Sequence, residues 1–460
     1  MDSSKSDVLV IFGVTGDLVR RKIFPALAVL FHRGQLVMPV IGVARGGWTL
    51  ERLQQRVAES LDAHGNIDGD AGAALSAQLS HVDGDYRDPA TYARLKQMLK
   101  DRRRPLIYLA IAPGMFETVI AGLVDAGCTA NARVVVEKPF GRDLASARAL
   151  NRTLHAAFTE SAVFRIDHYL GKEAVQNLSY FRFANSFLEP IWNQTHVASI
   201  QLTIAEQLGM AGRGRFYEEV GAIRDVVQNH LLQVIALLTM DAPAGQDADA
   251  IRNEKLRVLR AIRPVTTSDL VRGQYRGYRD EPGVSSTSRV ETFVALRLHI
   301  DTWRWSGVPI YVRSGKRLPL SATEVLVELR RPPLAVFDDT STAASNYLRF
   351  RLSPEVVIAL GTRVKRLGEP MRGEAVELVA RHTRAGEDLP YERLLHDAAR
   401  GDSSLFTQDQ SVEAAWRVVE PALTEPPPVE EYEPGTWGPD TKDVHAVRWH
   451  NPAAEASQPC

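Results

Sequence analysis

The chain has 460 residues, 45% of them hydrophobic, and a formal net charge of −1 at pH 7. This length is enough to bury a substantial core and indicates two or three domains. The near-neutral charge argues against a nucleic-acid-binding surface or a polybasic membrane anchor, and no apolar run approaches the length of a membrane span. With only two cysteines, neither a disulfide framework nor a thiolate metal site is expected, which fits a reducing, cytoplasmic location.

The first predicted element is a strand that runs into a glycine turn. Val8–Phe12 is a continuous apolar run, as expected of a strand buried on both faces. A helical pattern follows the turn and extends to about Gly34. Strand, glycine turn and helix is the context in which a backbone can approach a dinucleotide pyrophosphate. The spacing is GxxG rather than GxGxxG, so a purely structural turn is the alternative. The candidate cofactor-binding residues are Gly13, Thr15, Gly16, Asp17 and Leu18.

The second predicted strand, Val40–Ala44, ends at Arg45. NAD-binding proteins usually place an acidic residue here, where it accepts a hydrogen bond from the ribose 2′-hydroxyl. An arginine would instead pair with the 2′-phosphate of NADP through a charge-assisted contact. An ordinary surface arginine is the alternative.

Strands and helices then alternate up to about residue 172. Helices are predicted around 50–64, 89–100 and 115–126, and strands over 106–110, 133–136 and 161–167. The alternation predicts a parallel, doubly wound sheet that binds ligands at the carboxyl ends of its strands. Arg45, Lys138 and the charged segment Arg165–Glu173 all lie at such ends.

The segment Arg165–Glu173 is the densest group of charges in the chain. It contains Asp167, His168 and Lys172, and a helical pattern runs from Lys172 to about Asn185. If that helix began early, His168 and Lys172 would lie four residues apart on one face, where both could meet an anion. A solvated strand-to-helix turn is the alternative.

Beyond residue 172 the pattern predicts an α+β domain with a mostly antiparallel sheet. We therefore expect a Rossmann-like dinucleotide-binding domain over 1–172 and a larger substrate and oligomerisation domain over 173–460. Strands are predicted over 198–206, 292–300, 309–312, 324–329, 346–352 and 356–361, and helices around 217–239 and 408–419. A small-polar loop is predicted over 244–250, and an extended surface arm over 425–434.

The helix predicted after Tyr217 carries Asp225, Gln228, Asn229 and His230. A lone helical histidine is more often a satisfied core or surface residue than a functional one. Here the neighbouring polar side chains need partners on a helix with a core-facing side, which favours a functional group. The strand end Arg313–Arg317 adds a glycine turn with two cations.

Together, five stretches resemble the glucose-6-phosphate dehydrogenase family, and the likeness covers nearly the whole chain in order, including 435–439. The five stretches are 13–18, 137–139, 165–173, 224–230 and 313–317. The stretch 165–173 and the Gln228-Asn229-His230 part of 224–230 are specific to that family. The glycine turn and Glu-Lys-Pro also occur in other dehydrogenases.

The resemblance implies oxidation of glucose 6-phosphate at C1 to the 6-phospho-glucono-1,5-lactone, the entry step of the oxidative pentose phosphate pathway, with hydride transfer to NADP. It implies His230 as the general base and Asp167 as the carboxylate that orients it. The implied substrate-binding residues are His168, Lys172, Glu206, Asp225, Lys316 and Lys138. Lys138 also lies near the cofactor, and its bond to Pro139 resembles one that is cis in the family. Because the nicotinamide accepts the electrons, no metal is expected.

Two features depart from the family pattern. The first is near Ser321, because Ser321 and its neighbours stand where relatives often carry a second lysine. The second is that Gly46-Gly47 follows Arg45, where many relatives have a polar side chain. Because this leaves fewer groups to hold the adenosine end of the cofactor, use of NAD stays open. One rival function is a dehydrogenase of unphosphorylated sugars, against which the cationic substrate residues argue. The other is a non-catalytic NADP sensor, against which Asp167 and His230 argue. A homodimer or homotetramer is expected from the sheet-rich second domain.

Overall fold

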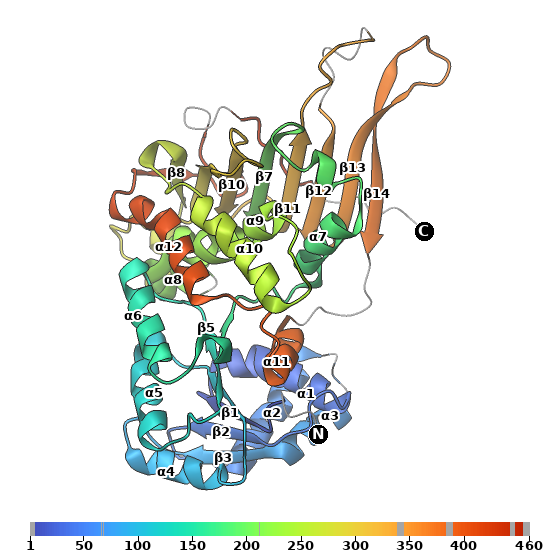
Figure 1. Cartoon of the computed structure of the whole chain (residues 1–460). Coiled ribbons are helices and arrows are strands. Elements are labelled where there is room, and N and C mark those ends of the chain that lie inside the picture. Colours follow the sequence, from blue (N-terminus) through green and yellow to red (C-terminus); the bar gives the residue numbers. More distant parts are fainter. Residues whose placement is uncertain are drawn as a thin grey trace. The chain divides into compact units, whose positions relative to one another are not determined.

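The structure is a computed structural model that describes residues 5–65, 67, 69–210, 212–337, 345–382, 390–441 and 447–453. The chain forms two compact units (Figure 1). The first contains Met1–Glu173, Pro243–Asn253 and Asp388–Glu413, and the second contains Ala174–Ala242, Glu254–Glu387 and Ala414–Cys460. None of the helices in the described ranges is long and apolar enough to cross a membrane.

The first unit is built on a parallel sheet of six strands in the order β3-β2-β1-β4-β5-β6. The strands are β1 (Val8–Phe12), β2 (Val40–Ala44), β3 (Leu79–Asp83), β4 (Pro105–Leu109), β5 (Arg133–Glu137) and β6 (Val163–Ile166). Every residue of β1, β2 and β4 is buried, which explains their continuous apolar sequences. The strand order reverses between β1 and β4, and open α/β sheets bind ligands beyond the carboxyl ends of the strands at such a point. The prediction of a Rossmann-like domain is confirmed.

The helices of the first unit are α1 (Phe24–His32), α2 (Leu50–His64), α3 (Gly69–Gln78), α4 (Pro89–Met98), α5 (Phe116–Asp125), α6 (Leu144–His155) and α11 (Pro390–Arg400). Three of them, α2, α4 and α6, begin at a residue whose side chain caps the helix. Thr49 caps α2 by accepting from the Arg52 N–H, and the helix ends at Gly65, which has a positive φ. The sequence did not predict α3, α6 or α11. Helix α11 packs against α1, although it is distant in sequence.

The second unit is built on a mixed sheet of nine strands in the order β14-β13-β12-β11-β7-β10-β9-β8-β15. They are β7 (Val197–Ala205), β8 (Leu270–Tyr275), β9 (Phe293–Leu298), β10 (Ile310–Gly315), β11 (Ala322–Leu329), β12 (Tyr347–Ser353), β13 (Val356–Lys365), β14 (Gly373–His382) and β15 (Val429–Tyr432). Neighbours are antiparallel except β7 with β10 and β8 with β15, so the predicted mostly antiparallel sheet is confirmed. The predicted surface arm over 425–434 contributes the edge strand β15.

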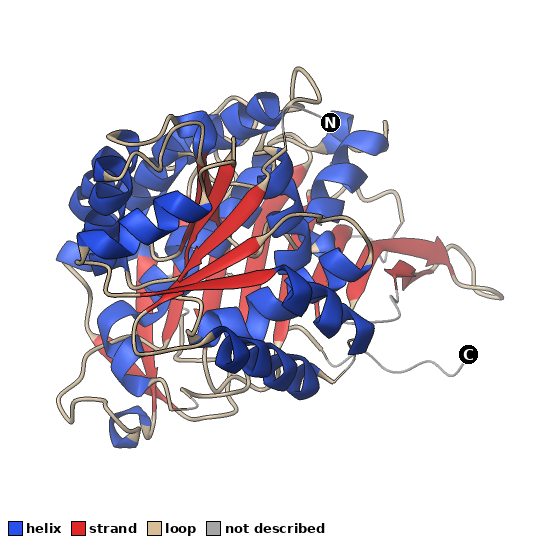
Figure 2. Cartoon of the chain, turned by 90° about the horizontal axis from the view of Figure 1, so that it is seen from below, coloured by secondary structure: helices blue, strands red, loops and turns tan. Residues whose placement is uncertain are grey.

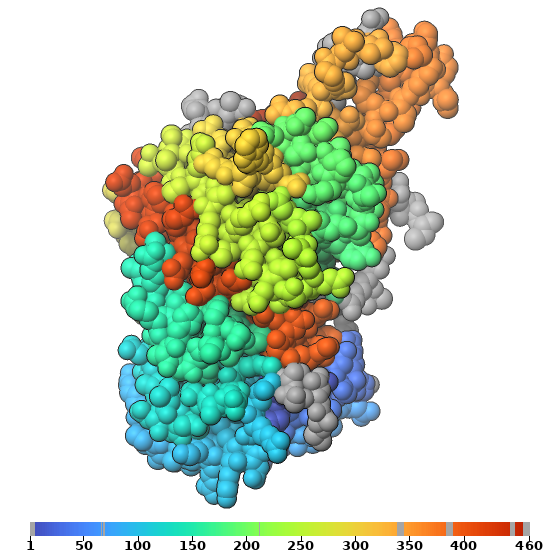
Figure 3. Space-filling view, in the orientation of Figure 1, coloured from blue at the N-terminus to red at the C-terminus, as the bar shows by residue number. Residues whose placement is uncertain are grey.

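Strands β13 and β14 form a long hairpin at the other edge of this sheet. Figure 1, in which both strands are labelled, shows the hairpin reaching beyond the remaining strands of the sheet, and Figures 2 and 3 show the same projecting end from below and as a surface. Several of its apolar side chains are exposed, among them Leu360, Val364, Leu378 and Val379. Large exposed apolar patches on soluble proteins often mark interaction sites.

The single helix predicted over 217–239 is wrong in one respect, because the chain kinks at Gly221. It forms α8 (Gly214–Ala222), a π-helical segment η5 (Ile223–Leu231) and α9 (Leu232–Thr239). Gly221 has φ 63° and ψ 178°, and a Cβ there would lie 2.4 Å from Oε1 of Glu291. The same carboxylate accepts from the Ile223 N–H at 3.1 Å and pairs with Arg272 at 2.7 Å. A buried ion pair between Arg272 of β8 and Glu291, which precedes β9, therefore holds the kink.

Three further helices complete the description: α7 (Glu173–Ala184), α10 (Ala248–Ala261) and α12 (Asp409–Thr424). The predicted loop over 244–250 is too long, because α10 begins inside it. Asp247 accepts from the Ala250 N–H at 2.9 Å, as a residue preceding a helix does.

Candidate active site

The glycine turn after β1 is held in a conformation that only glycine adopts easily. Gly13 has φ +79°, and a Cβ there would lie 2.2 Å from the carbonyl oxygen of Ala110 at the end of β4. The Gly13 N–H donates to the Val43 carbonyl at 3.0 Å and to the Tyr86 hydroxyl at 2.9 Å. The Gly16 N–H donates back to the Gly13 carbonyl at 2.8 Å. The backbone at this turn can therefore approach a pyrophosphate without obstruction by a side chain.

The turn leads into a π-helical segment, η1 (Val19–Ile23), which continues into α1. Asp17 is exposed and pairs with Arg20 at 3.6 Å and with Arg21 at 3.4 Å. The Thr15 carbonyl accepts from Nη2 of Arg56 at 2.7 Å, which ties the turn to α2. A positively polarised helix start beside a glycine turn is suited to an anionic ligand.

Arg45 lies where the sequence predicted it, directly after β2. Its side chain is 75% exposed, and its guanidinium lies 4.0 Å from a carboxylate oxygen of Asp85. Gly46 and Gly47 follow with positive φ, and the Gly47 N–H donates to Asp83 at 3.1 Å. Exposed ion pairs contribute only about 0–1 kcal/mol, so Arg45 can exchange this partner for a phosphate at little cost.

Two further arginines, which the sequence analysis missed, lie beside the same loop. The Arg52 guanidinium lies 4.2 Å from the Trp48 ring centroid, and that of Arg56 lies 5.5 Å from it. The signal was present in the sequence, because residues four apart share one face of α2. With Arg45 they give the first unit a cationic rim next to the glycine turn.

At the end of β5, Glu137 is a buried carboxyl that the sequence analysis quoted only as part of a motif. The Tyr108 hydroxyl donates to it at 2.5 Å, and Tyr391 of α11 also donates. Burial raises the pKa of Glu137 to about 7, and the two tyrosine hydrogen bonds and the charge of Lys138 oppose that rise. The Lys138–Pro139 peptide is cis, as the resemblance implied.

Past β6 the chain makes successive tight turns rather than an early helix. Asp167 is 2% exposed and accepts from the Tyr169 N–H at 3.0 Å. The next carbonyls accept from the N–H groups three residues on, and α7 begins only at Glu173. The idea that His168 and Lys172 share a helix face is therefore wrong. A Cβ at Gly171 would lie 2.8 Å from the Pro390 carbonyl, so the turn needs glycine to pack there.

Aromatic rings pack against the side chains of His168 and Lys172 in this turn. The His168 ring stacks on Tyr391, with centroids 6.4 Å apart and planes 10° apart, and meets the Tyr169 ring edge-on at 5.3 Å. Nζ of Lys172 lies 3.9 Å from the centroid of the Tyr169 ring. Such contacts restrict the directions in which the two side chains can point.

The arginine of the same segment has a structural role instead. Arg165 is fully buried and donates to both carboxylate oxygens of Glu160, at 2.8 and 2.9 Å, and to Asn151 at 3.0 Å. A buried charge needs such partners to be tolerated.

In the second unit, a parallel strand pair brings Glu206 and Lys316 together. Gly315 of β10 is in register with Ala205 of β7, so the residues that follow these two are neighbours. Nζ of Lys316 donates to Oε2 of Glu206 at 2.5 Å. Lys316 is only 3% exposed, and its backbone is held by Thr292 and Tyr432. The two positions that are far apart in sequence thus form one rigid pair.

Tyr217 of α8, which the sequence analysis did not propose, lies beside the Lys316–Glu206 pair. Its ring centroid is 5.6 Å from Nζ of Lys316. Burial holds the pKa of its hydroxyl well above the usual range, and the negative charges of Asp225, Glu291 and Glu206 raise it further. The buried phenol therefore stays protonated and lies among the proposed sugar-contacting side chains.

His230 and Asp225 both belong to the π-helical segment η5. In this geometry the backbone N–H of residue i+5 donates to the carbonyl of residue i. His230 is 3% exposed, and Asn229 beside it donates to the Arg224 carbonyl at 3.1 Å. π-helical turns occur frequently at functional sites.

Ser321, in the neighbourhood where the resemblance leads us to expect a second lysine, has a structural partner. Its hydroxyl accepts from the Gln207 N–H at 2.9 Å and so supports the turn that carries Glu206. Arg317 is exposed, has φ +53°, and its guanidinium lies 5.9 Å from the Tyr275 ring. It is a second cation beside Lys316.

The chain is matched by family models over both halves. The model described as glucose-6-phosphate dehydrogenase, NAD binding domain, matches residues 10–177, and the one described as the C-terminal domain matches residues 179–450. Glucose-6-phosphate 1-dehydrogenase 1 of Mycobacterium tuberculosis (strain CDC 1551 / Oshkosh) is 41% identical over 452 residues, covering 95% of this chain and 93% of that protein.

Two solved structures are similar along nearly their whole length. The crystal structure of glucose-6-phosphate 1-dehydrogenase from Mycobacterium avium has a TM-score of 0.92 and 41% identity, and the match covers 98% of this chain and 100% of that one. A glucose-6-phosphate dehydrogenase in complex with its substrate glucose-6-phosphate has a TM-score of 0.90 and 34% identity, with 97% and 99% covered.

Proposed function

Because this chain belongs to the glucose-6-phosphate dehydrogenase family, we propose that it oxidises D-glucose 6-phosphate at C1 to 6-phospho-glucono-1,5-lactone, with hydride transfer to NADP. The observation that carries the proposal is the match to that family over both halves of the chain.

The catalytic roles fall to His230 and Asp167. Hydride departure from C1 requires loss of the C1 hydroxyl proton, and His230 serves as the general base that accepts it. Asp167 orients the imidazole and favours the imidazolium formed during the reaction. In support, Asp167 is held by the Tyr169 N–H, and His230 lies in a π-helical segment.

Substrate binding divides into a phosphate end and a hydroxyl end. His168 and Lys172 bind the phosphate, and their orientation by aromatic rings supports this role. Glu206, Asp225 and Lys316 bind sugar hydroxyls, with the Lys316–Glu206 pair already in place. Lys138 contributes beside both cofactor and sugar.

The cofactor is NADP, which accepts the hydride at its nicotinamide ring. Its pyrophosphate is bound by the turn Gly13, Thr15, Gly16, Asp17 and Leu18, where the backbone is accessible. Its 2′-phosphate is bound by Arg45, with Arg52 and Arg56 adding positive charge. The exposed Arg45–Asp85 pair at 4.0 Å supports this assignment, because so weak a contact is easily replaced.

A steady-state assay of NADP reduction tests the proposal. With glucose 6-phosphate we expect turnover, and with glucose a kcat/KM lower by at least about a hundredfold, because two charge-assisted contacts of about 1.5–3 kcal/mol each are lost. Equal kcat/KM for the two sugars would favour a dehydrogenase of unphosphorylated sugars. No turnover with either sugar would favour a non-catalytic NADP sensor.

The domain bounds, the cellular location and the oligomeric state are part of the same proposal. We place the dinucleotide-binding domain at residues 1–172 and the substrate and oligomerisation domain at 173–460, in a cytoplasmic homodimer or homotetramer. The exposed apolar residues of the β13–β14 hairpin support self-association, because a flat, apolar edge of a sheet tends to be covered by another chain.

A further inference from the structure

A helix from late in the chain supports the turn 167–172, which carries the proposed phosphate ligand His168. Helix α11 belongs to the same compact unit as that turn, although it is distant in sequence. A Cβ at Gly171 would lie 2.8 Å from the Pro390 carbonyl oxygen and 3.0 Å from side-chain carbons of Leu394, which is fully buried. The turn therefore packs directly on the N-terminal end of α11.

Tyr391 links this packing to a buried carboxyl. Its ring is stacked on that of His168, with the centroids 6.4 Å apart and the planes 10° apart. Its hydroxyl donates to Glu137 at the end of β5, and the Tyr108 hydroxyl of β4 donates to the same carboxyl at 2.5 Å. The two tyrosines and the glutamate are all buried. Glu137 is thus connected to His168 through a single side chain.

A carboxyl at this depth has a cost that the two phenols offset. Burial raises the pKa of Glu137 to about 7, against the two tyrosine hydrogen bonds and the charge of Lys138, while the charge of Asp167 adds to the rise. Buried phenol hydroxyls need a partner, and one carboxyl here serves two of them, one from β4 and one from α11. A leucine side chain would fill a similar space and leave both hydroxyls unsatisfied. The carboxyl therefore determines where the Tyr391 ring lies.

We propose that Glu137 is a positioning residue for the substrate phosphate, because it holds the Tyr391 ring on which the imidazole of His168 stacks. A ring anchored at its hydroxyl cannot swing away without breaking that hydrogen bond, so the stacked imidazole keeps its direction. This inference rests on the proposed function, in which His168 binds the phosphate. It gives Glu137 a role distinct from that of its neighbour Lys138, which the same function places beside cofactor and sugar.

Three roles for Glu137 predict different results. A purely structural carboxyl would affect stability alone. A carboxyl that acted through Lys138 would alter cofactor affinity and the chemical step as well. A carboxyl that acts through Tyr391 alters the affinity for the phosphorylated sugar and leaves kcat nearly unchanged, because the phosphate takes no part in the bond changes at C1. The values of KM and kcat and the environment of His168 therefore separate the three roles.

The first measurement is NMR of the full chain and needs no turnover. With the histidines isotope-labelled at Cε1, the His168 resonance is assigned by its disappearance in His168→Asn, and the stacked Tyr391 ring shifts it through its ring current. Glu137→Leu should move this resonance, and Tyr391→Phe, which keeps the ring but loses the anchor, should move it in the same direction. Glu137→Gln should leave it near its original position, because an amide can accept from one hydroxyl and donate to the other. An unmoved resonance in both Glu137→Leu and Tyr391→Phe would overturn the inference.

The second measurement is steady-state kinetics with saturating NADP. Glu137→Leu should raise KM for glucose 6-phosphate by about 5- to 30-fold, as expected when buried polar groups beside a ligand lose their partner, and should leave kcat within about twofold. Glu137→Gln should restore most of the affinity. Adding Tyr391→Phe to Glu137→Leu should change little more, because the effects of residues in contact are not additive. Equal rises in KM for glucose 6-phosphate and for NADP would place the effect at Lys138 and overturn the inference.

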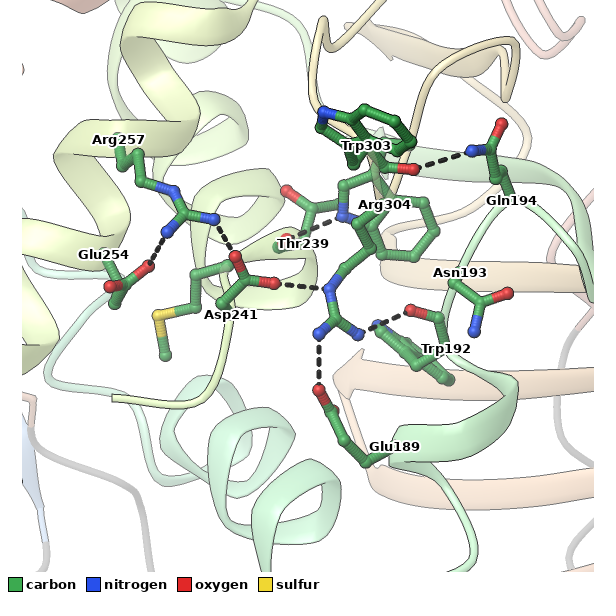
Figure 4. Close-up of polar contacts among 12 residues, drawn as sticks. Glu189, Trp192, Asn193, Gln194, Thr239, Asp241, Glu254, Arg257, Trp303 and Arg304 are labelled. Atoms are coloured by element: carbon green, nitrogen blue, oxygen red, sulfur yellow. Dashed lines mark hydrogen bonds and ion pairs between the residues drawn. The ribbon is translucent and has the colours of Figure 1, made fainter. Parts of the chain in front are cut away.

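Two control variants make the same chemical changes elsewhere. Tyr347→Phe removes a hydroxyl that donates to Glu377 at 3.0 Å. Glu189→Leu removes a carboxylate that accepts from Arg304 at 2.6 Å (Figure 4). Both positions lie in the second unit and outside the proposed site. Both variants should therefore leave KM for glucose 6-phosphate unchanged, whereas Glu189→Leu should lower Tm because it leaves an arginine with one partner fewer.

The proposed function and this inference can fail separately. A lower Tm for Glu137→Leu with an unchanged KM for glucose 6-phosphate would leave this carboxyl a structural role and overturn the inference alone. If the unmutated chain does not oxidise glucose 6-phosphate, the proposed function fails, and inorganic phosphate then serves as the probe. A His168 resonance that responds to phosphate at lower concentrations in the unmutated chain than in Glu137→Leu would still support the inference. Equal phosphate titrations, or no response in either chain, would overturn it.

Discussion

The two units hold their candidate site residues in different ways. In the parallel-sheet unit, Arg45 and the glycine turn lie on loops at strand ends, and Arg45 is largely exposed with a weak partner at 4.0 Å. In the nine-stranded unit, Lys316 and His230 are each 3% exposed, and Lys316 is already paired with Glu206. Exposed contacts adapt to a ligand and adjust its affinity, whereas buried, prearranged groups act on the chemical step with little reorganisation. The comparison teaches that substitutions in the second unit should affect turnover, and those at Arg45 mainly cofactor affinity.

The largest effect is expected at the proposed base. His230→Asn should lower kcat by about 10²–10⁴, the range typical of a lost general base, with little change in KM. His32→Asn, at the exposed end of α1, is the matched control and should behave as the unmutated chain. A kcat near that of the unmutated chain for His230→Asn would remove this residue from the mechanism.

A buried acid makes the first unit more sensitive to pH than its exposed turns suggest. Burial raises the pKa of Glu137 to about 7, so between its unfolded value and pH 7 the folded chain holds a proton that the unfolded chain lacks. The contribution of Glu137 to the free energy of unfolding is therefore fully present below its unfolded pKa and is lost as the pH rises through its folded pKa of about 7, by about 3 kcal/mol.

Glu137→Gln should remove that part of the pH dependence. Denaturant unfolding at pH 5 and pH 8 measures it, with Glu117→Gln, an exposed carboxylate on α5, as the control. If the free energy of unfolding changed by the same amount between pH 5 and pH 8 in Glu137→Gln and in the unmutated chain, the assignment would be wrong.

The next largest effect is expected at Lys172, in the turn before α7. Lys172→Ala should lower kcat/KM for glucose 6-phosphate by about 10- to 150-fold, because one charge-assisted contact of about 1.5–3 kcal/mol is lost. The kcat/KM for glucose should hardly change, so the ratio between the two sugars narrows. Lys100→Ala, an exposed lysine of the same unit, should change neither value. If Lys172→Ala lowered kcat/KM equally for glucose 6-phosphate and for glucose, this lysine would not bind the phosphate.

At the exposed end of the cofactor site, Arg45→Ala should raise KM for NADP by about tenfold or more and leave KM for NAD unchanged. An equal rise in KM for NADP and for NAD would show that Arg45 does not bind the 2′-phosphate. Arg372→Ala, in the exposed connection between β13 and β14, is the control.

The smallest effect is expected at the partner of Arg45. Asp85→Asn removes a carboxylate that competes with the 2′-phosphate, so KM for NADP should fall by at most about fivefold, the limit of an exposed ion pair. A rise in KM for NADP would mean that Asp85 positions Arg45 rather than competing for it.

The sequence by itself predicted that the first unit contains a parallel sheet and which residues lie at the ends of its strands, although it did not predict α3, α6 or α11. Apolar runs such as Val8–Phe12 indicate strands buried on both faces, and alternation with helices indicates a parallel sheet. Local turn chemistry then places Gly13 and Arg45 at strand ends without knowledge of the fold. Glu137 shows the limit of this reasoning, because nothing local says that its carboxyl is buried between Tyr108 and Tyr391.

Only the tertiary structure decided how the second unit is arranged. The kink at Gly221 depends on Glu291, which is distant in sequence and precedes β9, and the π-helical segment that carries His230 begins two residues after the kink. The Lys316–Glu206 pair depends on the parallel pairing of β7 with β10, whose residues lie more than a hundred positions apart. Sequence periodicity reports only local geometry, whereas strand pairing and the partners of buried charges are set by contacts between segments that are distant in the chain.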